Sequence, residues 1–373
     1  MTTRVHAPVP APVPPSFGAH RFDHSLILRI LLALAVLLGF FLFAVPARAA
    51  ASSYPWSSLL FNGDPHFEHS FTMPFEYSKD HIFLNLTVNG HADMVFLFDT
   101  GSNVNILDMT TSQKLGIHPV FLVKERGVGY GSGKVRIAAA ENLDARLGAI
   151  HIASAMTLVD LHNLELLNIH HLDGILGLPV LHQFIVEIDF SDRLITFYPR
   201  TGFLYAGNGE ALNMVSPGDS VAIPVELATG TRRQRNALLD LDTGSDATVM
   251  LYSDFITKSH IAETSSRGAL TLVPASAYGI GGLFDLQSVI VPFCLIGHTE
   301  MQQLPVFLMH TTPEFSGRRR TDGVVGTNIL SLFRRVVFDE PHGRVILERR
   351  SDMNLALDNS EDAKGVGSIW VKP

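Results

Sequence analysis

The sequence is short of cysteine and of charge, and each shortage excludes classes of protein. Its 373 residues contain one cysteine, Cys294, so neither an intramolecular disulfide nor a thiolate metal cluster can form. Lysine and arginine number 28 against 36 aspartates and glutamates, and this net charge of −8 excludes nucleic acid as a partner because no basic excess is present. Only 17% of residues are charged and 46% are hydrophobic, which excludes general disorder and supplies a large core.

The N-terminal segment has the features of an export signal. Residues 30–45 are all apolar or glycine, arginines precede them, and small residues in an A-x-A pattern end at Ala49. This order predicts a secretory signal peptide cleaved after Ala49. The apolar stretch 26–46 is alternatively an uncleaved membrane anchor. In both interpretations the rest of the chain is periplasmic or secreted, and loss of residues 1–49, with four arginines and one aspartate, leaves a net charge of −11.

The remainder of the chain contains an internal repeat. An Asp-Thr-Gly-Ser motif occurs twice, each copy is followed by an Asp-Gly-hydrophobic-hydrophobic-Gly block, and each block is followed by two β-prone runs around a turn. The matching blocks are 99–102 and 242–245, 173–177 and 322–326, and 186–197 and 336–348. Three landmarks that repeat in the same order indicate a duplicated domain.

Local patterns around these blocks favour strands. Residues 82–88 form a β-prone run, Asn89-Gly90 is a hairpin turn signal, and the apolar run 94–98 ends at Asp99. Helical patterns are few, and 161–169 is the best of them. The sequence therefore predicts two all-β lobes. We assign residues 1–49 to the signal peptide or anchor, 50–65 to a linker, 66–205 to the N-terminal β lobe, 206–218 to the inter-lobe linker, 219–350 to the C-terminal β lobe and 351–373 to a tail in which 368–371 can add an edge strand.

The repeated motif carries the chemistry. An acid at a strand end, followed by a hydroxyl residue and glycine, lies in a tight turn that the backbone can approach closely. Two such acids in duplicated lobes can meet at a pseudo-twofold axis, where two carboxyl groups cannot both ionise readily and so share one proton. The ionised carboxylate can deprotonate a water while the protonated one polarises a peptide carbonyl, with neither metal nor cofactor.

The two Asp-Thr-Gly-Ser motifs and the two Asp-Gly blocks resemble the pepsin/retropepsin class of aspartic proteases, here of an exported bacterial type with both lobes in one chain. The resemblance covers about residues 75–348 and implies two closed β-barrels related by a pseudo-twofold axis. It implies that Asp99 and Asp242 are the catalytic pair. Support of the active-site loops would come from Thr100, Gly101, Ser102, Thr243, Gly244 and Ser245. The threonines would cross-link the two loops, the serines would bond the outer carboxylate oxygens, and the 175–177 and 324–326 segments would pass beneath the loops.

A glycine-rich segment at 129–133 resembles the tyrosine-bearing hairpin tip that closes over substrate in pepsin-like enzymes. We therefore assign the residues Tyr130, Gly131 and Ser132 to a flap that binds substrate, with an ordinary turn as the alternative. The segment 278–282 is interpreted as the symmetry-related hairpin rather than as a second flap. A phosphate loop is excluded because Val128 and Val135 stand where that motif needs glycine and serine or threonine.

Two further acids need separate interpretation. Asp246 follows the second motif, and we place it with the substrate-binding residues, with local turn hydrogen bonding as the alternative. Asp240 lies two residues before Asp242, where the first lobe has Leu97. It either faces solvent, pairs with Arg232, Arg233 or Arg235, or is buried beside the catalytic pair. His162, His170 and His171 lack a compelling metal-ligand spacing, so we predict no metal, and Cys294 is interpreted as a core residue.

The sequence therefore predicts an aspartic endopeptidase that acts as a monomer, without cofactor, on peptide or unfolded protein substrates. One alternative is a non-catalytic peptide- or protein-binding module on the same fold, against which the intact motif in both halves argues. Another is a protease dedicated to a single envelope or surface protein, which differs in substrate and not in chemistry.

Overall fold

The computed structural model of the chain describes residues 69–127, 129–131, 133–165, 171–215, 220–229, 234–262, 271–310, 321–350 and 370–372. All of them belong to one compact unit, Trp56–Pro373. None of the helices among these residues has the length and apolar character needed to cross a bilayer. The predicted export signal, the linker 50–65 and most of the tail lie outside the described residues.

Lobe 1, residues 69–205, is built on an eight-stranded sheet that closes on itself. Its strands, in spatial order, are β2 (Glu76–Ser78), β3 (His81–Val88), β4 (His91–Phe98), β9 (Gly174–Leu176), β5 (Ile106–Asp108), β8 (Ile150–Val159), β7 (Lys134–Leu147) and β6 (Phe121–Gly127). An additional pairing of β3 with β7, each next to an end of the row, closes the sheet into a ring. The predicted hairpin is present, because Asn89 and Gly90 adopt φ values of 50° and 81° between β3 and β4.

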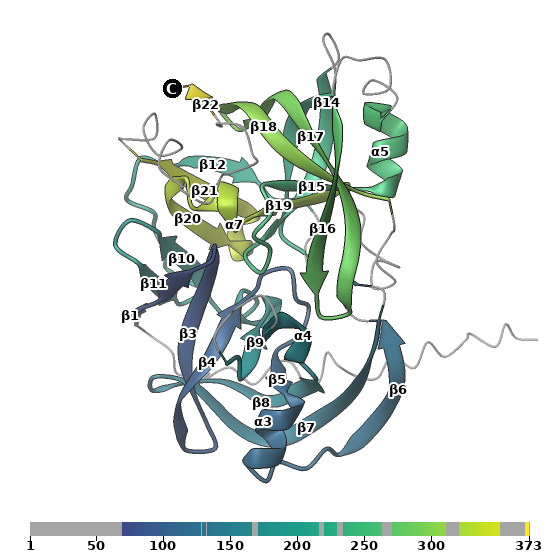
Figure 1. The fold of residues 1–373 in the computed structure, drawn as a ribbon. Helices are drawn as coiled ribbons and strands as arrows, with labels where there is room; N and C mark the ends of the chain where they lie inside the picture. The colour runs from purple at the N-terminus through teal and green to yellow at the C-terminus, as the bar shows by residue number, and fades with distance from the viewer. Residues whose placement is uncertain are drawn as a thin grey trace, which may run out of the picture. The chain divides into compact units, whose positions relative to one another are not determined.

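Lobe 2, residues 220–350, repeats this arrangement. The strands of its sheet are β16 (Leu272–Gly279), β17 (Gly282–Ile296), β13 (Ala222–Ala228), β14 (Gln234–Asp242), β19 (Gly323–Gly326), β15 (Val249–Tyr252), β18 (Thr299–Met309) and β22 (Trp370–Lys372). Pairing of β17 with β18 closes the second ring, and β22 of the tail is its edge strand. The blue and green halves of Figure 1 are these two rings. The predicted all-β, two-lobed fold is confirmed.

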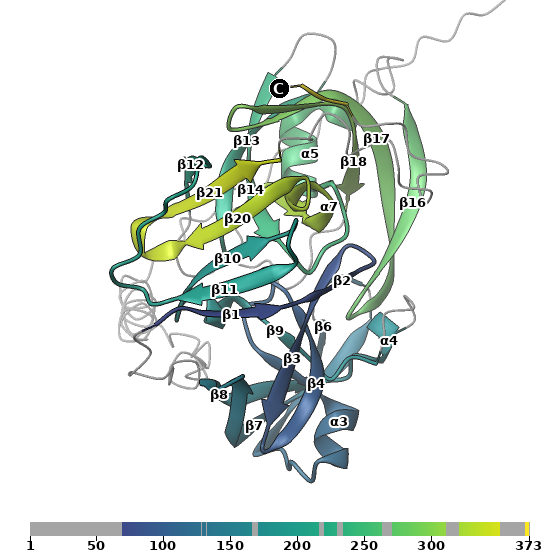
Figure 2. The same cartoon turned by 90° about the vertical axis from the view of Figure 1, so that its left-hand side faces the viewer.

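A third sheet, which the sequence analysis did not anticipate, joins the lobes. Its six strands are β1 (Phe71–Pro74), β11 (Leu194–Tyr198), β10 (Ile185–Asp189), β20 (Phe333–Asp339), β21 (Arg344–Arg349) and β12 (Glu210–Asn213). The predicted strand pairs β10–β11 and β20–β21 are present, and they join because β10 pairs antiparallel with β20. Figure 2 shows the six strands side by side. The two halves therefore share one continuous sheet.

The helices within the described residues are few and short. They are α3 (Met109–Lys114), α4 (His162–Glu165), α5 (Ser253–Ser259), α7 (Thr327–Leu330) and the 3-10 turns η1 (Leu178–Val180) and η3 (Glu340–His342). Of the helix expected at 161–169, the described part is α4. The main core includes side chains of both rings, such as Phe96, Phe98, Leu239 and Leu241, all nearly inaccessible to solvent. These residues alternate with the cleft-facing positions of β4 and β14, as strand geometry requires.

Ion pairs reinforce the shared sheet across the lobe boundary. The guanidinium of Arg335 on β20 donates to the carboxylate of Asp189 on β10 at 2.7 Å. Near by, the carboxylate of Glu340 lies 2.7 Å from Nδ1 of His182 and accepts from Arg200 at 2.6 Å. Both carboxylates are largely buried, so these contacts are worth more than exposed ion pairs.

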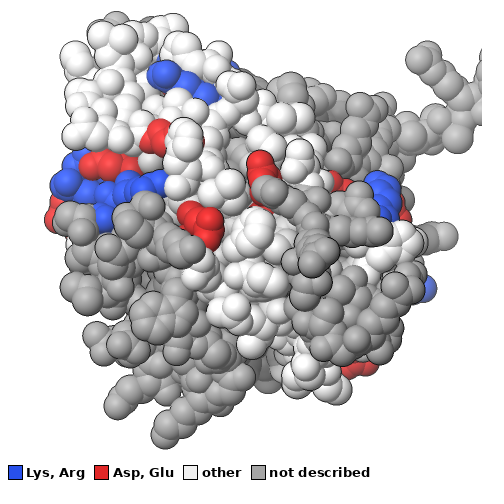
Figure 3. Space-filling view, turned by 90° about the horizontal axis from the view of Figure 1, so that it is seen from above, with Lys and Arg blue, Asp and Glu red and all other residues white. Residues whose placement is uncertain are grey.

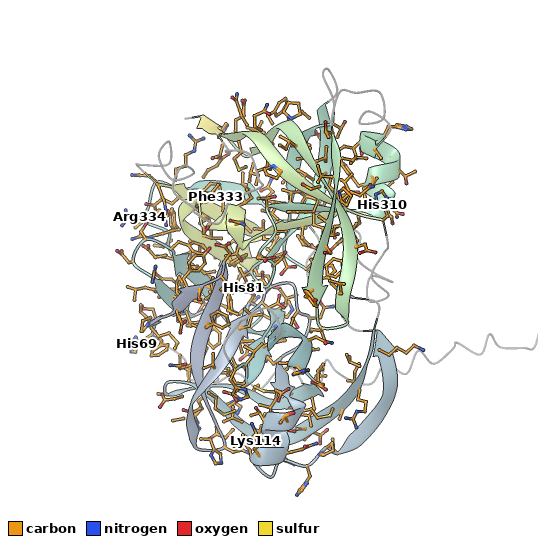
Figure 4. All side chains as sticks on the ribbon, in the orientation of Figure 1. His69, His81, Lys114, His310, Phe333 and Arg334 are labelled. Atoms are coloured by element: carbon orange, nitrogen blue, oxygen red, sulfur yellow. The ribbon has the colours of Figure 1, made fainter. Side chains whose placement is uncertain are left out.

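The protonation of these acids follows from their surroundings. Burial acts to raise the pKa of Asp189 and of Glu340, but hydrogen bonds from their partners outweigh it and lower both pKa values. For Glu187 on the same sheet, burial prevails and its pKa is raised. In the view from above, acidic and basic side chains lie together at the left-hand edge, the side on which Arg334 is labelled in Figure 4. Figure 3 thus shows a mixed charged surface beside the shared sheet.

Candidate active site

The two Asp-Thr-Gly turns have the same local geometry. Asp99 comes directly after β4, and Asp242 is the last residue of β14. In each turn the backbone N–H of the glycine donates to Oδ1 of the aspartate, at 2.8 Å from Gly101 to Asp99 and at 3.0 Å from Gly244 to Asp242. Each carboxylate is therefore fixed by its own loop, with one oxygen held by a backbone donor.

Thr100 and Thr243 cross-link the two turns, as the family resemblance implied. The hydroxyl of Thr100 donates to the carbonyl of Leu241 at 2.6 Å and accepts from the N–H of Thr243 at 3.0 Å. The hydroxyl of Thr243 donates to the carbonyl of Phe98 at 2.8 Å and accepts from the N–H of Thr100 at 3.0 Å. Both threonines are buried, so these four bonds hold the loops together away from solvent.

This cross-link brings the two carboxyl groups to one place. A Cβ atom built on Gly101 would lie 2.5 Å from Cγ of Asp242, and one built on Gly244 would lie closer still to Cγ of Asp99. Each carboxyl group thus packs against the glycine of the opposite turn, which no larger residue would permit. Both aspartates line a single cavity of about 490 Å³, a volume typical of ligand sites.

The segments that follow the Asp-Gly blocks support the loops from below. In lobe 1 the N–H of Asp99 donates to Leu176 on β9 at 3.0 Å, and the N–H of Leu178 donates to Ser102 at 2.8 Å. In lobe 2 the N–H of Thr327 donates to the carbonyl of Ser245 at 2.8 Å, and its hydroxyl donates to the carbonyl of Thr243 at 3.0 Å. The loops therefore rest on hydrogen-bonded backbone.

The acids that open these blocks have a role that sequence reasoning missed. The carboxylate of Asp173 accepts from the N–H of Val95 at 2.9 Å, and that of Asp322 accepts from the N–H of Leu238 at the same distance. Each bond ties the incoming strand to the segment beneath it. The sequence did contain an indication of this role, because both acids belong to the repeated Asp-Gly block.

The role expected for Ser102 is wrong, and the role expected for Ser245 stays a prediction. Ser102 donates its hydroxyl proton to the carbonyl of Val104 at 2.8 Å instead of to Asp99. A hydroxyl has one proton, so this bond uses the only one that Ser102 has. Ser245 accepts from the N–H of Ala247 at 3.3 Å. Both serines thus form a hydrogen bond within their own turns.

The two glycine-rich hairpin tips meet above the cavity. The N–H of Gly133 donates to the carbonyl of Gly281 at 2.7 Å, and the N–H of Gly281 donates to the carbonyl of Tyr130 at 2.8 Å. A Cβ on Gly131 would overlap the backbone of Gly281, so the tips can only approach this closely as glycines. Ser132, the third predicted flap residue, lies outside the described residues.

Each tip reaches the opposite lobe, and the flap role of the first hairpin stays a prediction. Tyr278, Gly279 and Ile280 of the second hairpin line the cavity together with Tyr130. Tyr130 packs against a cluster in lobe 2, here called the lobe-2 cluster, and Ile280 packs against its counterpart, the lobe-1 cluster. The lobe-2 cluster consists of Met250, Tyr252, Leu286, Met309 and Val324. The lobe-1 cluster consists of Phe83, Leu97, Ile106, Val135, Ile137, Val159, Leu161, Leu164, Leu172 and Ile175.

The remaining candidates take different positions. Asp246 is exposed and lines the cavity, and its carbonyl accepts from the side-chain amide of Asn328 at 2.9 Å. Asp240 is 2% exposed and accepts from the hydroxyl of Thr321 at 2.8 Å, so the solvent-facing interpretation is wrong. Arg232 and Arg233, and the side chain of Arg235, lie outside the described residues, as does His170.

His81 lines the cavity, and the sequence analysis did not identify it. It opens β3, is 6% exposed, and its Nδ1 lies 2.5 Å from the carbonyl of Lys79. Figure 4 labels it where the two lobes approach each other. Strand alternation could have placed His81 in the cleft, because it lies two residues before Phe83 and so projects from the same, cleft-facing side of β3. Among the residues that the structure describes, no three histidine, cysteine, aspartate or glutamate side chains are grouped to hold a metal ion.

A protein family and a solved structure are similar to parts of this chain. Residues 84–180, which include the first motif and its Asp-Gly block, match a family model described as aspartyl protease. No curated protein matches the chain significantly. Among solved structures, the aspartic proteinase from Irpex lacteus is similar with a TM-score of 0.48 and 15% identity, covering 78% of this chain and all of that one. The family match falls on the first of the two repeated lobes, and in that lobe the chain is similar to aspartyl proteases.

Proposed function

We propose that the chain is an aspartic endopeptidase that hydrolyses peptide bonds with a water molecule activated by Asp99 and Asp242. The observation that carries this proposal is the reciprocal packing of each carboxyl group against the glycine of the other turn, on one cavity. Two carboxyl groups so close share a proton, because both cannot ionise readily in a site of low dielectric constant.

The proposed reaction uses the two states of the pair. The ionised carboxylate takes a proton from a water held between the two groups while the protonated carboxyl donates to the carbonyl oxygen of the peptide. The water oxygen attacks the carbonyl carbon, and the proton later passes to the leaving amine. The N–H groups of Gly101 and Gly244 hold the carboxylates in position throughout.

The test is hydrolysis of an unfolded protein by the full chain between about pH 3 and pH 7, the range in which a shared-proton carboxyl pair operates. Asp99→Asn and Asp242→Asn should each abolish turnover without changing the fold. Asp93→Asn is the matched control, because Asp93 lies on β4, the strand that ends just before Asp99, is exposed and has a positive φ that asparagine tolerates. Wild-type activity in either of the first two variants would refute the assignment.

A non-catalytic peptide-binding module is the second candidate, since the cavity and its two hairpins would also hold a peptide. Saturable peptide binding without cleavage at any pH would favour it. We further propose export to the periplasm or beyond, with the lobes outside the cytoplasm and the protein monomeric. The N-terminal residue of the protein from its native source would distinguish a cleaved signal from a retained anchor, and sedimentation would give the oligomeric state.

A further inference from the structure

One histidine, His81, continues an apolar row on the lobe-1 wall of the cavity. Phe83 on β3 pairs with Leu97 on β4. The same register continued by two residues places His81 opposite Asp99. Residues two apart on a strand project from the same face of the sheet, and both His81 and Leu97 line the cavity. An imidazole ring therefore lies at the Asp99 end of an otherwise apolar row.

In lobe 2 the equivalent position is taken by a serine. Ala222 on β13 pairs with Asp240 on β14. This register continued by two residues places Ser220 opposite Asp242. Of the two equivalent residues, His81 lines the cavity and Ser220 does not. The histidine is therefore a feature of one side of the cleft and does not belong to the machinery that the two lobes repeat.

The two ring nitrogens of His81 have different surroundings. Nδ1 lies 2.5 Å from the carbonyl oxygen of Lys79, and because a carbonyl only accepts, Nδ1 carries a proton and donates it. Among the residues that the structure describes, none is hydrogen-bonded to Nε2. Nε2 is therefore the nitrogen left for a ligand, as an acceptor in the neutral ring and as a donor in the protonated ring.

A substrate in the cavity has to provide for this nitrogen. His81 is 6% exposed and lines the cavity, so a peptide seated there would cover what remains of its accessible surface. An apolar substrate side chain would then leave Nε2 buried without a partner, which is costly. A side chain with a hydrogen-bonding group would supply the partner, and a site of this kind discriminates strongly against analogues that lack the group.

Three carboxyl groups restrict which polar side chain fits. Asp99, Asp242 and Asp246 line the same cavity, so a substrate carboxylate brought beside His81 would meet like charges. An amide is neutral, and it offers N–H donors to a neutral imidazole and an oxygen acceptor to a protonated one. An amide side chain is therefore a suitable partner for both forms of the ring.

We infer that Nε2 of His81 selects a substrate residue with an amide side chain, as in glutamine or asparagine, at the position that lies against the Asp99 side of the cleft. The inference rests on the proposed function and specifies its substrate class. In this role His81 determines specificity by contact with the substrate, while proton transfer stays with the two aspartates.

The experiment uses the full chain and peptides that vary, one position at a time, at the three residues on either side of the cleaved bond. Glutamine is compared with norleucine, an apolar side chain of similar length, and with glutamate. At one position we expect kcat/KM for glutamine to exceed that for norleucine by at least about fivefold, the effect of leaving one buried polar atom unpaired. The value for glutamate at that position should also be lower than that for glutamine.

Two substitutions separate the two nitrogens of His81. His81→Asn places an amide near Nδ1, so it keeps a donor for Lys79 but has no group at Nε2, and the ratio of glutamine to norleucine should fall to about one. His81→Gln carries its amide further out, near Nε2, and should keep a ratio well above one. His91→Asn makes the same change at an exposed histidine on β4 and should leave the ratio as in wild type. Wild-type selectivity in His81→Asn, or an equal loss in His81→Asn and His81→Gln, would overturn the inference.

A binding arm separates this inference from the proposed function. The same peptides with a reduced, uncleavable bond are titrated into wild type and His81→Asn. Tighter binding of the glutamine peptide than of the norleucine peptide by wild type alone supports the inference even if no peptide is cleaved, an outcome that would refute only the endopeptidase proposal. Equal binding of the two peptides by wild type at all six positions overturns the inference and leaves His81 as a structural partner of Lys79.

Discussion

The threonine cross-link should carry a measurable share of the stability of the fold. Replacing Thr100 by valine removes a hydroxyl that donates to Leu241 and accepts from Thr243 while keeping the shape of the side chain. Two buried backbone groups, a carbonyl and an N–H, then lose their partners, and each such group costs about 1–3 kcal/mol. We therefore expect Thr100→Val to lower the free energy of unfolding by about 2–6 kcal/mol, a large part of the 5–15 kcal/mol of a typical domain.

The assay is urea unfolding followed by far-ultraviolet circular dichroism. Thr100→Ser is the first control, because it keeps both hydrogen bonds and should cost less than about 1.5 kcal/mol. Thr196→Val is the second, because Thr196 meets Thr72 at an exposed site and its loss should stay within about 0.5 kcal/mol. If Thr100→Val cost no more than Thr100→Ser, the reasoning that the cross-link stabilises the loops through buried hydrogen bonds would be refuted.

Three other predictions concern pH, the hairpin tips and the thiol. The lowered pKa values of Asp189 and Glu340 contribute stability that is present above about pH 4 and is lost as pH falls through the folded-state pKa values. The midpoint of urea unfolding should therefore drop on acidification, and it should drop less in Asp189→Asn. Gly131→Ala should lower kcat/KM because its methyl group would overlap the opposite hairpin tip. Gly116→Ala is the control, because Gly116 also has a positive φ but has open space around it, and this variant should leave kcat/KM unchanged. Equal effects of the two substitutions would refute the role of the contact between the tips in activity. Burial raises the pKa of Cys294, so iodoacetamide should label it in urea but not in the native protein.

Much of this fold was predictable because it repeats. The apolar run before Asp99 indicated a strand that ends at an acid, and the second copy around Asp242 indicated its partner. Asn89 and Gly90 predicted their own hairpin because few other residues adopt positive φ at both positions. Local conformations of this kind depend on residues that are neighbours in the sequence and not on the rest of the chain.

What the sequence did not predict depends on contacts between distant residues. The shared sheet forms because β10 pairs with β20, with Val186 opposite Phe338. Each of these strands already has a hydrogen-bonded neighbour in its own hairpin, so the local sequence does not indicate this further pairing. The hydroxyl of Ser102 donates to the carbonyl of Val104, a contact that depends on the geometry of the turn. The partner of Tyr130 was equally hidden, because Tyr252 lies 122 positions away in the other lobe.

Fusion of the two halves into one polypeptide lets them evolve separately. An enzyme assembled from two identical copies must accept every substitution on both sides of its axis, so its walls stay alike. Here Leu97 in lobe 1 has Asp240 as its counterpart in lobe 2, and Tyr130 at one hairpin tip and Ile280 at the other pack against opposite lobes. A bound peptide would consequently meet unlike surroundings before and after the axis, and would have one favoured sense of threading, N to C or C to N.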